Sequence, residues 1–244
     1  MPGLSIPRII GHRGAKATAP ENTLAGIRQA KREGAAWVEI DVRLTADGHP
    51  VLMHDETLDR TTSGRGPVRV ATLDEIKRLD GGVRFGPAWE GEPVPTLVEA
   101  LAVFAELDLG FNLEIKPCPG RETETARIAV DVVRQLWSAD RPVPVISSFS
   151  EAALMAARTA APALPRGYLV KALPAAWKQE VEQLDCATVH VSWRKLTPTQ
   201  VRAVKAAGLP LLVWTVNEVP RARALLSWGV DGVITDCPAR LAGL

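Results

Sequence analysis

Short apolar segments alternate with longer amphipathic segments along most of the chain. The apolar segments are rich in β-branched residues, as strands are, and lie at residues 8–11, 37–42, 51–53, 111–115, 143–147, 167–170, 188–191, 211–215 and 232–235. The intervening stretches are rich in Ala, Arg and Leu and favour helices. Three of them end at a glycine directly before the next strand, at Gly34, Gly208 and Gly229, as helices commonly do. The pattern therefore predicts repeated strand–helix units.

Nine candidate strands are one more than an eight-stranded barrel holds. The sequence Thr45-Ala-Asp-Gly48, between the segments 37–42 and 51–53, is typical of a hairpin loop. One of these two segments is therefore expected to lie above the barrel and outside its wall. A dinucleotide-binding sheet is the competing architecture, but no G-x-G-x-x-G sequence follows any of the strands. We predict an α/β fold, a (β/α)8 TIM barrel, with a small insertion after the strand that ends at His54.

Residues 56–95 interrupt the alternation. These 40 residues contain six Gly and four Pro, a quarter of the segment, and one short helical pattern at residues 73–79. A length of 244 residues allows one TIM barrel or two small domains, and of these we expect a single domain, 1–244. Within it, 56–95 is expected to be an inserted capping segment over one end of the barrel.

The charge balance excludes several classes of partner. The 29 Lys and Arg residues against 28 Asp and Glu leave a net charge of +1, so no broad positive field exists to hold a nucleic acid. No stretch of 18 apolar residues occurs, and the first residues lack the pattern of a signal peptide. We expect a cytoplasmic protein, monomer or homodimer, that binds no nucleic acid and does not insert stably into a membrane.

Candidate catalytic chemistry begins at the first two strands. The first apolar segment leads directly into His12 and Arg13. Glu39 and Asp41 are two residues apart on the second strand, so their carboxylates point to the same face. Two buried carboxylates on one face would repel each other unless a cation lay between them, which favours a divalent metal. An exposed edge strand with solvated acids is the alternative.

Further polar residues follow at later strand ends. His54 ends the third apolar segment, and Glu114 and Lys116 share one face of the next strand. TIM-barrel active sites form where the carboxyl ends of the strands meet. Carboxylate oxygens suit Ca²⁺ or Mg²⁺, while an Arg and a Lys beside such a cation suit a phosphate group. The two imidazoles can serve as base and acid for displacement at phosphorus.

The chain resembles the glycerophosphodiester phosphodiesterase family in ten motifs that occur in family order. They are His12-Arg-Gly14, Pro20-Glu-Asn-Thr23, Glu39-Ile-Asp41-Val, Thr45-Ala-Asp-Gly48, Val51-Leu-Met-His54-Asp55, Leu58-Asp-Arg60-Thr61-Thr62, Leu113-Glu114-Ile-Lys116, Ser147-Ser-Phe149, Val213-Trp-Thr-Val-Asn217 and Gly232-Val-Ile-Thr-Asp236. The motifs extend across nearly the whole chain, and a chance match to all ten in order is negligible.

The resemblance implies a fold, a reaction and a set of roles. The fold is a barrel similar to that of the phosphatidylinositol phospholipases. The reaction is metal-dependent hydrolysis of glycerophosphodiesters, such as glycerophosphocholine or glycerophosphoethanolamine, to sn-glycerol 3-phosphate and an alcohol. The implied roles are metal ligands for Glu39, Asp41 and Glu114, general acid and base for His12 and His54, and phosphate binding for Arg13 and Lys116.

Two other functions remain possible on the same scaffold. A lysophospholipase D or sphingomyelinase D would need an apolar groove, which Phe85 and Trp89 in the insertion could form. A non-catalytic glycerophosphate-binding module is expected to lack one of the implied histidines or carboxylates, whereas all seven positions are intact here.

Several other residues permit two interpretations. Trp214 either closes the pocket around the glycerol as a substrate-binding residue or belongs to the core. Asn22-Thr23 is typical of a helix N-cap. We expect Asp236 to be a capping or loop residue and His190 to be structural.

Overall fold

The computed structural model describes residues 4–244 and contains a closed ring of eight parallel strands. The first strand pairs with both the last and the second, and this double pairing closes the ring. The ring consists, in spatial order, of β1 (Ile9–His12), β9 (Gly232–Thr235), β8 (Leu211–Trp214), β7 (Thr188–Ser192), β6 (Arg166–Val170), β5 (Val145–Ser148), β4 (Gly110–Ile115) and β2 (Trp37–Leu44). The predicted TIM barrel is confirmed.

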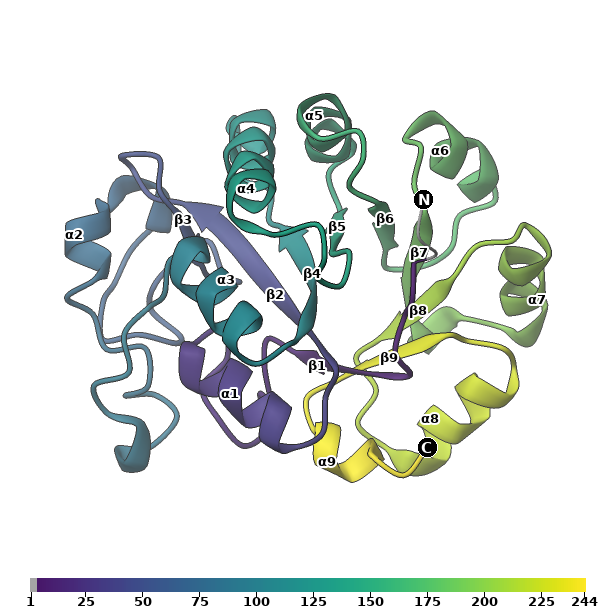
Figure 1. The fold of residues 1–244 in the computed structure, drawn as a ribbon, viewed down its shortest axis with the longest axis horizontal. Coiled ribbons are helices and arrows are strands. Elements are labelled where there is room, and N and C mark those ends of the chain that lie inside the picture. The colour runs from purple at the N-terminus through teal and green to yellow at the C-terminus, as the bar shows by residue number, and fades with distance from the viewer. Residues whose placement is uncertain (1–3) are drawn as a thin grey trace.

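Helices surround the ring, as Figure 1 shows. One helix precedes each return to the ring: α1 (Leu24–Arg32), α3 (Leu97–Glu106), α4 (Glu122–Leu136), α5 (Glu151–Ala160), α6 (Trp177–Gln183), α7 (Pro198–Ala206) and α8 (Val219–Ser227). The short helix α9 (Pro238–Leu241) follows β9, and the 3-10 turn η3 (Trp193–Lys195) follows β7. None of the helices among residues 4–244 is both long enough and apolar enough to cross a membrane.

The ninth strand lies outside the ring. β3 (Pro50–Leu52) pairs antiparallel with the carboxyl end of β2, where Val42 lies opposite Leu52 and Leu44 opposite Pro50. The two strands form the predicted hairpin, and β3 is the segment that leaves the barrel wall. His54 follows β3 and is thereby carried to the carboxyl-terminal end of the barrel.

Residues 56–95 contain little regular structure. They include η1 (Val68–Val70), α2 (Leu73–Ile76) and η2 (Pro87–Trp89), beside β3 at one edge of the view in Figure 1. A small apolar cluster holds the segment to the hairpin, and it consists of Val51, Met53, Leu58, Val68, Ile76 and Val94. The segment also contacts the first helix, because Ala25 N donates to Glu92 Oε1 at 2.9 Å. The predicted helix over 73–79 is shorter than expected and ends at Ile76.

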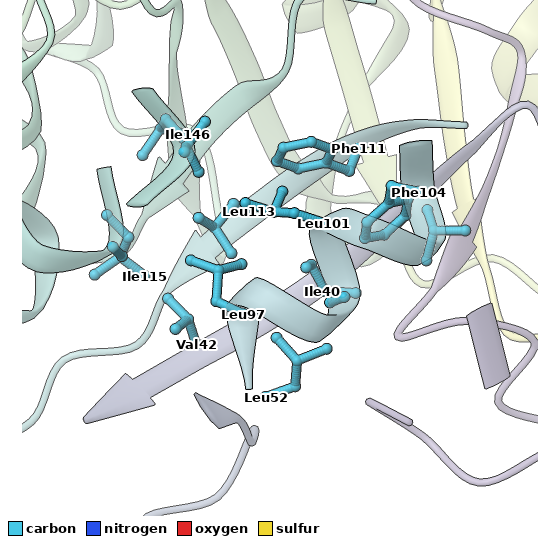
Figure 2. Close-up of a cluster of buried hydrophobic side chains, with 14 of the residues drawn as sticks. Ile40, Val42, Leu52, Leu97, Leu101, Phe104, Phe111, Leu113, Ile115 and Ile146 are labelled. Atoms are coloured by element: carbon cyan, nitrogen blue, oxygen red, sulfur yellow. The ribbon is translucent and has the colours of Figure 1, made fainter. Parts of the chain in front are cut away.

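The largest apolar core lies between the ring and the helices. Alternate residues of the strands point outward into this layer, whereas their neighbours point into the barrel. Figure 2 shows the part of this core around α3, with Ile40 and Val42 of β2, Phe111, Leu113 and Ile115 of β4, Ile146 of β5, Leu52 of β3, and Leu97, Leu101 and Phe104 of α3. Because Ile40 and Val42 point outward, Glu39 and Asp41 point into the barrel.

Candidate active site

One cavity at the carboxyl-terminal end of the barrel collects most of the predicted site residues. It is lined by His12, Arg13, Glu39, His54, Asn112, Glu114, Lys116, Phe149, Leu169, His190, Trp214, Thr215 and Ile234. Asp41 is the predicted residue outside this lining, and it is buried beside Glu39 and Glu114. The predicted residues, which come from five separate segments of the chain, therefore meet at one site.

Three carboxylates form the acidic part of the cavity. Glu39, Asp41 and Glu114 are buried, and each offers an oxygen within 4.8 Å of the others. Glu39 Oε1 and Asp41 Oδ1 are buried without a hydrogen-bond partner. Oxygen ligands at this spacing, with unpartnered oxygens among them, fit a hard divalent cation. The residues present therefore fit the metal that the sequence predicts.

The carboxylates strongly affect one another's ionisation. Burial, followed by the charges of Asp41 and Glu114, raises the pKa of Glu39 well above its ordinary value. Burial and the charge of Asp41 also raise the pKa of Glu114, to about 7. Burial alone would raise the pKa of Asp41, but nearby positive charges outweigh it and lower that pKa. Without a cation the site thus carries more negative charge than its surroundings stabilise.

Two basic side chains lie against the carboxylates. Lys116 Nζ is 2.5 Å from Glu114 Oε1 and 3.3 Å from Asp41 Oδ1. Arg13 Nε is 3.1 Å from Asp41 Oδ2. Arg13 and Lys116 are both buried, so their charges act at low local dielectric. Both positive charges therefore face the group of three carboxylates.

A tight turn after β1 aims Arg13 into the cavity. Arg13 has a φ of 54°, in the left-handed region, and Gly14 has a φ of 97°. A Cβ on Gly14 would lie 2.5 Å from the backbone carbon of Gly26 in α1, so the turn can approach the helix only without a side chain. This packing explains why a glycine follows the His-Arg pair.

Each catalytic candidate histidine is held by a carboxylate. His12 Nδ1 is 2.6 Å from Asp236 Oδ1, and Asn217 Nδ2 donates to Asp236 Oδ2 at 2.8 Å. His54 Nδ1 is 2.6 Å from Asp55 Oδ1. Burial is the largest influence on both rings and lowers the pKa of His12 and of His54 below 6.5. Both imidazoles are therefore predominantly neutral near pH 7, as a general base requires.

Comparison with known proteins identifies the family. The sequence profile described as the Glycerophosphoryl diester phosphodiesterase family matches residues 12–240, which is nearly the entire chain. The chain belongs to this family. It is therefore an enzyme, a phosphoric diester hydrolase that acts on glycerophosphodiesters, as its sequence motifs predict.

Relatives over the full length support this assignment. The glycerophosphodiester phosphodiesterase of Caldanaerobacter subterraneus subsp. tengcongensis is 36% identical over 241 residues, covering 97% of this chain and 96% of that protein. The Bacillus subtilis glycerophosphodiester phosphodiesterase is 34% identical over 258 residues, covering 96% of this chain and 86% of its own.

Solved structures of glycerophosphodiester phosphodiesterases and their relatives share the fold. An Oleispira antarctica phosphodiesterase, solved in complex with its product sn-glycerol-3-phosphate, superposes with a TM-score of 0.95 at 42% identity, covering 98% of this chain and 96% of that one. The Agrobacterium tumefaciens glycerophosphodiester phosphodiesterase gives a TM-score of 0.81 at 31% identity, covering 98% and 100%. These comparisons do not favour the lysophospholipase D, sphingomyelinase D or binding-module alternatives.

Several further residues of this phosphodiesterase site fall within the ten motifs, but the sequence pattern assigns them no role in the active site. Asp236, expected to be a capping or loop residue, lies in the loop after β9 and in addition contacts His12. Asn22 donates from Nδ2 to Asp41 Oδ2 at 2.8 Å, whereas its neighbour Thr23 is the N-cap of α1. Arg60, from the inserted segment, contacts both Asp55 and Glu21, and Glu21 in turn accepts from Arg13. Asp55 directly follows His54, so its position in the sequence alone places it beside a catalytic candidate.

The raised pKa of Glu39 gives a prediction about stability. In the metal-free phosphodiesterase, Glu39→Gln is expected to raise Tm by roughly 2–8 °C at pH 8, because it removes a buried charge. The folded pKa of Glu39 lies above its ordinary 4.5, so wild-type stability falls as pH rises above that value. The difference in Tm between Glu39→Gln and the wild type should therefore shrink toward pH 5.

Thermal unfolding with chelator, at several pH values, measures this effect. With saturating divalent cation the wild type should have the higher Tm, since the variant lacks one of the carboxylates expected to hold the ion. A lower Tm for Glu39→Gln in chelator at pH 8 would contradict the prediction.

Proposed function

We propose that this phosphodiesterase cleaves glycerophosphodiesters such as glycerophosphocholine and glycerophosphoethanolamine to sn-glycerol 3-phosphate and the free alcohol, using His12 and His54 as its acid–base pair. The observation that carries the proposal is the single cavity in which two carboxylate-held imidazoles, three carboxylates and two basic side chains meet. The phosphate-containing product in the Oleispira antarctica relative supports the same substrate class.

Glu39, Asp41 and Glu114 are the proposed ligands of the metal, which we propose to be Ca²⁺ or Mg²⁺. An all-oxygen donor set is what these hard cations prefer. A bound cation supplies positive charge that stabilises the phosphorane-like transition state and lowers the pKa of a nearby hydroxyl.

Arg13 and Lys116 are proposed to bind the non-bridging phosphate oxygens. Both now contact Asp41, through Nε at 3.1 Å and Nζ at 3.3 Å. If a cation neutralised the carboxylate charges, both donors would be free to bind the phosphate. A guanidinium and an ammonium on one phosphate give charge-assisted hydrogen bonds that strengthen as charge develops at phosphorus.

The two histidines divide the proton transfers. One neutral imidazole takes the proton of the attacking hydroxyl. The other must enter the step as the imidazolium, the minor form near pH 7, to deliver a proton to the departing alkoxide. Asp236 and Asp55 hold the Nδ1 atoms of His12 and His54, which leaves each Nε2 for the reacting group. A carboxylate on Nδ1 also stabilises the imidazolium that forms at Nε2. The symmetry of the two pairs permits either division of roles.

Trp214 is proposed to bind substrate together with Phe149. Their rings meet edge to face, with centroids 5.8 Å apart, and both line the cavity. They form an apolar wall suited to the carbon atoms of the glycerol.

The chain is further proposed to act as a single barrel domain with 56–95 as its capping segment. A cytoplasmic location and a monomeric or homodimeric state stay predictions.

A substrate panel tests the proposed function. The panel is glycerophosphocholine, glycerophosphoethanolamine, glycerophosphoglycerol and a lysophospholipid, with released sn-glycerol 3-phosphate measured enzymatically. We expect release from the first three. Turnover of the lysophospholipid alone would contradict the proposal and favour lysophospholipase D activity.

A further inference from the structure

One arginine of the inserted segment 56–95 joins two parts of the active site. Arg60 donates from Nε and Nη2 to the carboxylate of Asp55, at 2.6 and 3.0 Å. It also donates from Nη1 and Nη2 to the carboxylate of Glu21, at 2.8 and 2.7 Å. Asp55 contacts His54 Nδ1, and Glu21 accepts from Arg13 Nη1 at 2.8 Å. The guanidinium of Arg60 therefore binds both carboxylates that hold a candidate acid–base ring and a candidate phosphate-binding side chain.

The backbone around Arg60 is firmly held. Leu58 belongs to the apolar cluster against the hairpin and is 3% exposed, and Thr62 is fully buried. Thr62 N and Oγ1 both donate to Leu58 O, at 3.1 and 2.7 Å, and these bonds close a short turn over residues 58–62. Because both ends of this turn are buried, Arg60 projects from a fixed base.

The backbone and the ring of His54 are held by different residues. Arg43 is buried and donates from Nε and Nη2 to His54 O, at 3.0 and 2.8 Å. The ring is held at Nδ1 by Asp55, which lies in the loop directly after it. Two hydrogen bonds from one planar guanidinium fix the orientation of the Asp55 carboxylate. The direction in which His54 Nε2 points consequently depends on a residue two contacts away.

The second carboxylate fixes Arg13 in a similar way. Glu21 binds Nη1 of Arg13, whereas Nε of the same guanidinium lies 3.1 Å from Asp41 Oδ2. Burial alone would raise the pKa of Glu21, but the hydrogen bonds from Arg60, followed by the charge of Arg13, lower it to about 2. Hydrogen bonds from Arg60 are also the largest influence that lowers the pKa of Asp55. Both carboxylates therefore stay ionised near neutral pH.

The exposure of Arg60 argues against a mainly stabilising role. Its side chain is 47% exposed, and exposed ion pairs contribute little to folding stability. The same guanidinium nevertheless makes four hydrogen bonds to two carboxylates, an arrangement that gives geometric precision. Precise placement of reacting groups is a large contribution to catalysis.

We propose that Arg60 is a positioning residue of the reaction, which orients His54 through Asp55 and Arg13 through Glu21. This inference rests on the proposed function and gives the inserted segment a task within it. Arg60 acts through the two carboxylates and not on the substrate itself. One guanidinium thereby sets an acid–base group and a phosphate-binding group, which follow different strands, in a fixed relation to each other.

Removal of the guanidinium tests the proposal. Arg60→Ala is expected to lower kcat for glycerophosphocholine about ten- to hundredfold, since small misplacements of reacting groups have effects of this order. KM should rise by a smaller factor, because Arg13 keeps its contact with Asp41. Tm should stay close to that of the wild type. Added guanidinium should restore much of the lost rate, because the space left by the side chain is open to solvent, whereas urea at the same concentration should not.

Two further variants separate positioning from a general disturbance of the segment. Arg78 is an exposed arginine of the same segment, and its Nε donates to the backbone oxygen of Asp74 at 3.0 Å. Arg78→Ala should keep the wild-type kcat and should not respond to guanidinium. In an Asp55→Asn background, Arg60→Ala should lower kcat by a smaller factor than in the wild type, because one of its two routes is already broken.

The proton on His54 Nδ1 gives a readout that does not depend on turnover. Its NMR signal, identified by its absence in His54→Ala, should be present in the wild type and in Arg78→Ala but lost through exchange with water in Arg60→Ala. A wild-type kcat and an unchanged signal in Arg60→Ala would overturn the positioning role, as would a rate loss that guanidinium fails to restore. If the wild type hydrolyses no glycerophosphodiester, the proposed function itself is contradicted, and the signal still decides whether Arg60 orients His54.

Discussion

His54→Ala is expected to lower kcat for glycerophosphocholine by about 10²- to 10⁴-fold, and His12→Ala by a similar factor. Each variant removes one of the two groups that are proposed to move protons. The metal carboxylates and the basic side chains remain, so substrate should still bind and KM should change far less than kcat. Steady-state kinetics on purified variants, with product detection of sn-glycerol 3-phosphate, measures both constants.

His49 provides the matched control for these histidine variants. It lies in the hairpin turn, with half of its side chain exposed, and His49→Ala should leave kcat unchanged. The wild-type rate should fall on the acid side with a midpoint below pH 6.5, because burial lowers the pKa of both catalytic candidates. A kcat for His54→Ala within tenfold of wild type would remove His54 from the proposed mechanism.

Removal of divalent cations is expected to reduce turnover by about 10³-fold or more, since a cation at a phosphoryl oxygen is worth several kcal/mol. Activity should return on adding back Ca²⁺ or Mg²⁺, and the ion that restores it at the lower concentration is the preferred one. Asp41→Asn should not be restored by either ion at the same concentration, because the variant lacks a buried ligand at the centre of the carboxylate group.

The metal prediction has a readout that is independent of turnover. Calorimetric titration of the stripped protein should show one tight site in the wild type and a much weaker one in Asp41→Asn. Full activity after thorough chelation and stripping, with no ion bound, would contradict the metal assignment.

Much of the fold can be predicted from the sequence because the alternation of side chains along a strand is a local pattern. Alternation along β2 and β4 places Glu39 and Asp41, and then Glu114 and Lys116, on the inward face without any knowledge of the fold. The hairpin at residues 45–48 likewise follows from its turn residues alone. The TIM barrel and the cluster of three inward-facing carboxylates could therefore be predicted from short-range patterns.

The remaining parts of the site depend on contacts between distant segments. Asp236 and His12 are 224 residues apart in the chain, and Arg60 is 39 residues from Glu21. No periodicity connects such pairs, so Asp236 is predicted only as a loop residue. His190 presents a similar difficulty, because a buried histidine with a structural partner and one with a free nitrogen facing a cavity have the same sequence pattern.

Closure of the ring has a consequence for the timing of activity during protein synthesis. His12 lies on the first strand and Asp236 follows the last, so the two meet only when β9 joins β1. A nascent chain that has emerged as far as β8 already contains both histidines and all three carboxylates, yet its first imidazole has no carboxylate to orient it. His12 gains the carboxylate that orients it only when the last strand joins the first, so full catalytic competence is expected no earlier than the step that completes the fold.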